Sequence, residues 1–186
     1  MIWTILHKKK KGIPMEQNSR REKFIFLLAL SISTAIFCGI WAALAPLVGL
    51  LSWAGFAGCT TYFSTGSHGW VGLRRTLLPN LAGLACGISC FYLGEFFPVL
   101  GTWGVWCAII TFIMCIVSYF KLLDFCPGIF MGCFSTFASL GGAADCGGIP
   151  MVFVYLGLSL IAGAFLGVLC DKGGVLLHKL FTRKNK

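Results

Sequence analysis

Charged side chains are scarce in this sequence. They make up 11% of the 186 residues, whereas 58% of the residues are hydrophobic and the mean hydropathy is +0.87. A soluble domain usually has about a quarter of its residues charged, because its surface must be hydrated. A soluble fold of this size would leave roughly a third of its chain's surface exposed, and this sequence has too few polar side chains to cover that surface. The composition therefore predicts an integral membrane protein.

Long uncharged runs divide the chain into six predicted transmembrane helices. A helix crosses the ~30 Å hydrocarbon layer in about 20 residues, and runs of about that size end near Pro46, Glu95 and Lys121. We expect an all-α membrane protein with a basic tail at 1–23, a membrane domain at 24–170 and a second basic tail at 171–186. The predicted spans are 24–44, 47–65, 77–96, 100–120, 127–144 and 149–169.

The positions of the basic residues predict the orientation of these spans. With both termini in the cytoplasm, all 15 Lys and Arg residues fall on the cytoplasmic side, including Arg74, Arg75 and Lys121 in the loops. Cytoplasmic loops are enriched in Lys and Arg, so this pattern supports six spans. It also gives a net charge of +9 without the basic face that a nucleic-acid-binding protein needs.

The start of the chain allows two interpretations. A basic stretch followed by an apolar run and Ala43-Leu44-Ala45 resembles a cleavable signal peptide. Its apolar run of about 20 residues exceeds the usual 7–15, and further spans follow directly, so we favour a retained first span. Met15 is a second candidate start beside Met1.

Ionisable side chains are missing from the interior of the predicted spans. The acids Glu95, Asp124 and Asp145 lie at span ends, and the three His residues lie in predicted loops or tails. Proton relays and charged-substrate sites in membranes are usually marked by intramembrane ionisable residues. Their absence argues against a proton-driven pump, a membrane protease or a lipid-modifying enzyme. Without a nucleophile–base pair, we expect no enzymatic activity.

The ten Cys residues form no CxxC pair. Cys86 and Cys90 are four residues apart on one predicted helix face, which is too little for a metal or redox motif. In a membrane span Cys behaves as a small apolar residue, so we expect neither a metal nor another cofactor. Asn80 is the one strongly polar uncharged side chain at predicted membrane depth, and we interpret it as a helix-end residue beside Pro79.

The second and fifth spans resemble each other. Residues 53–63 (WAGFAGCTTYF) align without gaps on residues 127–137 (PGIFMGCFSTF), at an offset of 74 positions (132 − 58). Halves of three spans must have opposite orientations, and inverted repeats around a midplane site recur in transporters. We therefore predict two inverted three-helix repeats. Small residues four apart let helices approach closely, and the predicted helix-packing residues are Ala54, Gly83, Gly87, Gly128, Gly163 and Gly167.

The chain also resembles the YcdZ-like family of bacterial inner-membrane proteins, a domain of unknown function (DUF1097). The resemblance lies in residues 49–63 (GLLSWAGFAGCTTYF), in 127–132 (PGIFMG) with 136–138 (TFA), and in Met114-Cys115 before 121–123 (KLL). It covers roughly residues 32–169 and does not extend to residues 1–21. It implies the bacterial inner membrane as the location, and it implies no activity.

Two functions fit these patterns. The first is a channel or facilitator for a small neutral solute, because pore selectivity depends on diameter and lining hydrogen-bond groups and needs no titratable residue. Aromatic constrictions, hydroxyl groups and repeat-core residues would come from Phe56, Gly58, Cys59, Thr60, Phe63, Phe130, Gly132, Cys133, Thr136 and Phe137. The second is a non-transporting membrane subunit or assembly partner. The expected partners are the lipid bilayer, a small neutral solute and further copies of the chain (a homo-oligomer), with no nucleic acid.

Overall fold

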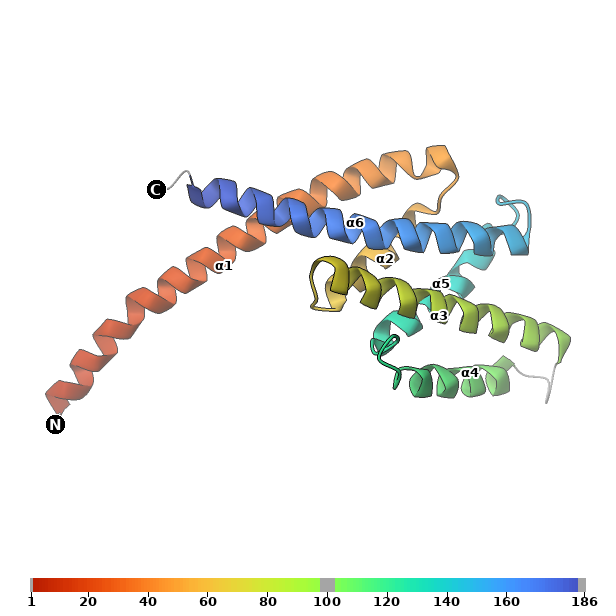
Figure 1. Cartoon of the computed structure of the whole chain (residues 1–186), viewed down its shortest axis with the longest axis horizontal. Helices are drawn as coiled ribbons and strands as arrows, with labels where there is room; N and C mark the ends of the chain where they lie inside the picture. The colour runs from red at the N-terminus through yellow and green to blue at the C-terminus, as the bar shows by residue number, and fades with distance from the viewer. Residues whose placement is uncertain (1, 98–102, 184–186) are drawn as a thin grey trace. The chain divides into compact units, whose positions relative to one another are not determined.

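The structure is a computed structural model that describes residues 2–97 and 103–183, with side chains described from Arg20 onward. These residues form helices and no strand. The helices are α1 (Ile2–Leu44), α2 (Ser52–Ser64), α3 (Gly69–Phe96), α4 (Trp103–Val117), α5 (Cys126–Ser139) and α6 (Ile149–Arg183), with short 3-10 turns η1 (Pro46–Val48) and η3 (Leu140–Gly142). The all-helical class predicted from composition is confirmed for the described part of the chain (Figure 1).

Three of the described helical segments are long and apolar enough to cross a membrane: Arg20–Val48, Gly69–Phe96 and Ile149–Arg183. Trp103–Val117 is apolar but shorter, with 15 residues. The helices α2 and α5 have 13 and 14 residues, which at 1.5 Å per residue gives about 20 Å each, less than the ~30 Å hydrocarbon layer. The six-span count therefore stays a prediction.

Several helices extend beyond the predicted spans. The helix α1 begins at Ile2, within the predicted tail 1–23. The helix α3 begins at Gly69 rather than at 77, and α6 continues through the predicted C-terminal tail to Arg183. A helix satisfies its own backbone hydrogen bonds, so it need not end where the lipid ends. Several basic residues, including Arg74, Arg75 and Lys172, therefore lie within helices.

The chain forms two compact units. The terminal unit combines the chain up to Ile36 with the chain from Cys170 onward. In it, the buried Ser33 hydroxyl donates to the Cys170 carbonyl at 2.8 Å, and the Phe26 and His178 rings meet edge to face with centroids 5.4 Å apart. Asp171 is buried although it lies in the segment that the sequence assigns to a tail. The α1 and α6 segments of this unit are thus a packed helix pair.

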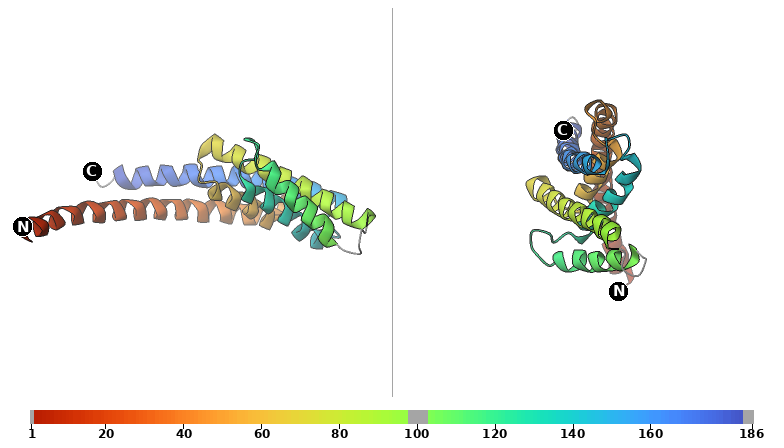
Figure 2. Two further views of the ribbon diagram at one scale, coloured as in Figure 1. Left: turned by 90° about the horizontal axis from the view of Figure 1, so that it is seen from below. Right: turned by 90° about the vertical axis from the view of Figure 1, so that its right-hand side faces the viewer.

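The central unit, Phe37–Leu169, contains α2 to α5 and the adjoining parts of α1 and α6. Within it α3 packs most extensively on α5, and α4 lies along α3 (Figures 1 and 2). A hydrogen bond connects α2 and α3 across the loop between them, since the Gly69 N–H donates to the Tyr62 hydroxyl at 2.8 Å. Arg75 in α3 donates to Asp124 before α5 at 3.0 Å, which fixes the adjacent ends of these helices.

Candidate functional site

The interface of α3 with α5 is built on glycines. A Cβ atom added at Gly83 would lie 2.7 Å from the Ile129 carbonyl carbon, and one added at Gly132 would lie 2.9 Å from the Leu84 nitrogen. Real Cβ atoms essentially never come within 3.0 Å of such atoms. The two backbones are therefore in direct contact, as expected for small residues at a helix crossing in lipid.

The interface of α2 with α6 has the same construction. A Cβ atom at Gly163 would lie 2.7 Å from the Gly55 carbonyl carbon, and one at Gly58 would lie 3.0 Å from the Ala164 nitrogen. Here too a missing side chain on each helix brings the facing backbone into contact. The sequence predicted close packing at these glycines, and the structure places each of them against a particular neighbouring helix.

The contacts of the two interfaces correspond residue by residue. Each α5 position lies 74 residues after its α2 counterpart, and each α6 position lies 80 residues after its α3 counterpart (163 − 83). With these offsets, the contact of Gly132 with Leu84 in one interface corresponds to the contact of Gly58 with Ala164 in the other. A third pair continues the register: a Cβ atom at Gly87 would lie 2.6 Å from the Thr136 Cβ, and one at Gly167 would lie 2.7 Å from the Tyr62 Cβ. Three contacts thus keep the same two offsets.

The burial pattern follows the same offsets. Along α2 and the 74-residue-shifted segment of α5, the buried, half-buried and exposed positions agree everywhere except at Phe56 and Phe130. Residues 71–90 and 151–170 agree everywhere except at 77 with 157 and at 86 with 166. Corresponding residues therefore occupy equivalent environments in the central unit.

The predicted site residues are distributed between this core and the surface. Cys59, Gly58, Gly132, Cys133 and Thr136 are buried. Of the four aromatic residues proposed as constrictions, Phe56, Phe63 and Phe137 are half-buried, whereas Phe130 is 40% exposed; the Thr60 side chain is exposed. Phe137 packs on the cluster formed by α3, α4 and α5, and its ring faces Trp103 with centroids 6.1 Å apart. The structure thus buries the small residues of the predicted site, whereas its aromatic residues are half-buried or exposed.

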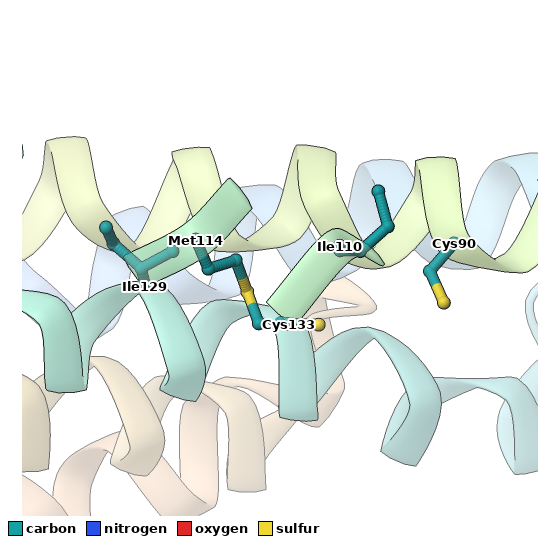
Figure 3. Close-up of a cluster of buried hydrophobic side chains, with 5 residues drawn as sticks. All are labelled: Cys90, Ile110, Met114, Ile129 and Cys133. Carbon is teal, nitrogen blue, oxygen red and sulfur yellow. The ribbon is translucent and has the colours of Figure 1, made fainter. Parts of the chain in front are cut away.

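An apolar cluster fills the space between α3, α4 and α5. Figure 3 shows its members, which are Cys90, Ile110, Met114, Ile129 and Cys133. All are at least nine-tenths buried. The two cysteines pack here among aliphatic side chains, which agrees with their interpretation as small apolar residues.

Buried hydroxyl groups of the central unit mostly donate within their own helix. Thr136 donates to the Gly132 carbonyl at 3.0 Å, Thr61 to the Ala57 carbonyl at 2.9 Å and Thr76 to the Gly72 carbonyl at 2.8 Å. Ser159 on α6 donates to Tyr155 and accepts from the Leu51 N–H, which ties the start of α2 to α6. Such bonds allow a hydroxyl to be buried at little cost.

Two buried polar groups differ from these hydroxyls. Asn80 is 1% exposed and Ser135 is fully buried, yet neither the Asn80 amide nor the Ser135 hydroxyl has a hydrogen-bond partner among the described residues. The interpretation of Asn80 as a helix-end residue is wrong, since it lies inside α3, which begins at Gly69. The sequence feature that could have indicated a buried polar group was an amide side chain within an otherwise apolar run.

The comparisons with known proteins agree on one family. Residues 31–175 match the family model described as "Protein of unknown function (DUF1097)". The chain is 41% identical to the inner membrane protein YcdZ of Escherichia coli over 116 residues, which cover 62% of this chain and 71% of that protein. It is 40% identical to the Salmonella typhimurium YcdZ over 62% of the chain and 72% of that protein. The uncharacterized E. coli protein YahC is 28% identical over 86% of this chain and 97% of its own length. No solved structure matches significantly.

Proposed function

Because the chain belongs to the DUF1097 family and is an integral protein of the bacterial inner membrane, we propose that it is a channel or facilitator for a small neutral solute, built from two inverted three-helix repeats. The observation that carries this proposal is the pair of equivalent glycine interfaces, α2 with α6 and α3 with α5. Two inverted repeats around a central site are a recurrent transporter design.

The directions of the helices support six passages through the membrane. Along the α2–α6 interface the contacts advance from Gly55 with Gly163 to Tyr62 with Gly167, so these two helices run parallel. The contacts from Gly83 with Ile129 to Gly87 with Thr136 likewise make α3 parallel to α5. In a chain that crosses the membrane at every helix, the second and sixth spans share one direction and the third and fifth share the other. The contact register is consistent with that alternation.

The short helices α2 and α5 support a transport role. They occupy corresponding positions of the two halves, and each has too few residues to cross the hydrocarbon layer as a straight helix. Short or interrupted segments at corresponding positions of inverted halves are typical of transporter binding sites. Neither helix contains an Asp, Glu, Lys, Arg or His, which favours a solute without charge.

The close backbone contacts also favour a second function, that of a non-transporting subunit or assembly partner. Direct glycine contacts hold helices together without leaving space for a solute. The large apolar side chains exposed on α4, such as Phe112 and Ile116, would then contact lipid or another membrane protein.

Reconstitution into liposomes separates these two functions. We expect protein-containing vesicles to re-swell faster than protein-free vesicles after osmotic shock with glycerol or acetamide, measured by stopped-flow light scattering. Sucrose, which is too large to pass, serves as the impermeant reference. Rates equal to those of protein-free vesicles for every solute tested would remove the transport proposal and leave the assembly-partner function.

The proposed orientation, with both termini in the cytoplasm, predicts which loops a membrane-impermeant maleimide reaches from outside. In a variant without native cysteines, Asp145→Cys should be labelled on intact cells, because the loop between η3 and α6 faces outward. Leu122→Cys, which is 57% exposed in the loop between α4 and α5, should be labelled only after the cells are permeabilised. Labelling of Leu122→Cys on intact cells would contradict this orientation.

A further inference from the structure

Asn80 lies where three helices of the central unit meet. Its backbone carbonyl faces Gly132 of α5. A Cβ atom added at Gly128, one turn earlier on α5, would lie 2.9 Å from the Pro79 Cβ and 3.3 Å from the Thr61 Cγ2 of α2. Asn80 therefore directly follows Pro79, and Gly128 of α5 lies beside both Pro79 of α3 and Thr61 of α2. We call this region the α2/α3/α5 junction.

The Asn80 side chain lowers the stability of the folded protein at this position. It carries two N–H donors and a carbonyl acceptor, and no described residue pairs with either amide atom. A buried amide without hydrogen bonds destabilises a folded protein markedly, because it loses its bonds to water and gains none. In native structures such unpartnered groups are few, and each calls for an explanation such as a functional role or a bound molecule.

The other half of the central unit shows that the fold does not require an amide here. The counterpart of Asn80 at the 80-residue offset is Leu160, which is also 1% exposed and faces Gly58 in the way that Asn80 faces Gly132. Leucine has the same number of side-chain heavy atoms as asparagine, in the same branched arrangement, and no polar group. The equivalent environment thus accepts an apolar side chain, and the polarity of Asn80 has no packing reason.

Ser135 is the second unpartnered group, and its spacing places it on the same face of α5 as Gly128 and Gly132. It follows Gly128 by seven residues, two helical turns, and Gly132 by three residues, about 4.5 Å of helix rise. Its counterpart at the 74-residue offset, Thr61, donates to Ala57, whereas the Ser135 hydroxyl has no described partner. The two unpartnered groups therefore come from the two helices that form the α3–α5 interface, Asn80 from α3 and Ser135 from α5.

From these observations we propose that Asn80 and Ser135 bind a small uncharged solute that both donates and accepts hydrogen bonds, such as a short amide or polyol. This inference rests on the proposed transport function. The amide of Asn80 would supply a donor and an acceptor, and the hydroxyl of Ser135 either one. Ions are disfavoured, because the described residues of α2 and α5 carry no charge to balance them.

The first test measures stability and does not depend on transport. Asn80→Leu should raise the thermal unfolding midpoint in detergent by about 3–10 °C, because it removes an unpaired amide and matches the residue of the other half. Ser135→Ala should leave the midpoint unchanged or higher. The matched control is Ser139→Ala on the same helix, where the buried hydroxyl donates to Thr136 at 2.7 Å, and this change should lower the midpoint. A lower midpoint for Asn80→Leu would show that the amide is already paired, and would overturn the inference.

The second test measures flux with the same variants. In the liposome assay, Asn80→Leu should reduce glycerol and acetamide permeation at least about tenfold, since a buried polar site loses its hydrogen bonds to the solute. Ser89→Ala on the exposed face of α3 should permeate like the wild type. Wild-type flux that Asn80→Leu leaves unchanged would overturn this inference alone. Wild-type flux no greater than that of protein-free vesicles would overturn the proposed function, and this inference with it.

Discussion

Replacing Gly132 by leucine should prevent α3 and α5 from packing and leave little folded protein. A side chain at Gly132 would have to occupy the space of the Asn80 carbonyl and the Leu84 nitrogen. These are backbone atoms of a helix, so they cannot rotate away as the end of a flexible side chain would. Overpacking of an interior typically costs about 1–3 kcal/mol, and separating two helices also loses the contacts along their whole interface.

Gly58→Leu should have the same result on the other interface, because a Cβ atom there would lie 2.6 Å from the Leu160 carbonyl oxygen. The matched control is Gly104→Leu in α4, where no described residue lies within 4 Å of an added Cβ atom. Folded yield is measured as the monodisperse fraction after detergent extraction and size-exclusion chromatography. We expect yields of Gly132→Leu and Gly58→Leu several times lower than that of Gly104→Leu. Equal yields for the three variants would show that neither glycine lies in a close helix contact.

Three of the predicted apolar runs, 24–44, 77–96 and 149–169, lie within helical segments that are long and apolar enough to cross a membrane. Polar and ionisable side chains are costly inside the hydrocarbon layer and therefore rare there, so the long apolar runs are visible without a structure. The alignment of 53–63 on 127–137 likewise indicated a similarity of α2 and α5, and the burial patterns of these two helices agree except at Phe56 and Phe130. Both kinds of signal are local, and a local signal needs no knowledge of neighbouring helices.

The choice of helix partners could not be predicted in this way. Glycines four residues apart show that a helix is packed closely, but not which helix packs against it. Gly83 and Gly163 were predicted as packing residues from spacing alone. Their facing residues, Ile129 and Gly55, are known only from the three-dimensional arrangement.

The character of Asn80 was missed for a related reason. Beside Pro79, an asparagine is typical of a turn or a helix end. The helix α3 begins at Gly69, eleven residues before Asn80, so Pro79 and Asn80 both lie in the helix interior. Whether an interior amide is paired depends on the side chains of α2 and α5, and these come from distant parts of the sequence.

The matching contacts of the two helix interfaces give a second strong expectation, for the smallest possible change. Gly83→Ala and Gly163→Ala should lower the unfolding midpoint by similar amounts. At both positions the added methyl group would lie 2.7 Å from a carbonyl carbon of the facing helix, Ile129 in one case and Gly55 in the other. A cost of about 1–3 kcal/mol corresponds to a fall of roughly 2–12 °C for a chain of this size.

Gly39→Ala in α1 provides the control, because no atom of the described part of the chain lies within 4 Å of its added Cβ atom. Alanine is favoured over glycine in a helix by up to about 1 kcal/mol in water, so this variant should unfold at the same temperature as the wild type or higher. The measurement is a thermal unfolding series in one detergent, followed by tryptophan fluorescence. If Gly83→Ala lowered the midpoint and Gly163→Ala behaved like Gly39→Ala, the two interfaces would not be mechanically equivalent. The shared offsets of 74 and 80 would then describe a resemblance of shape, and the inverted repeat would lose its main support.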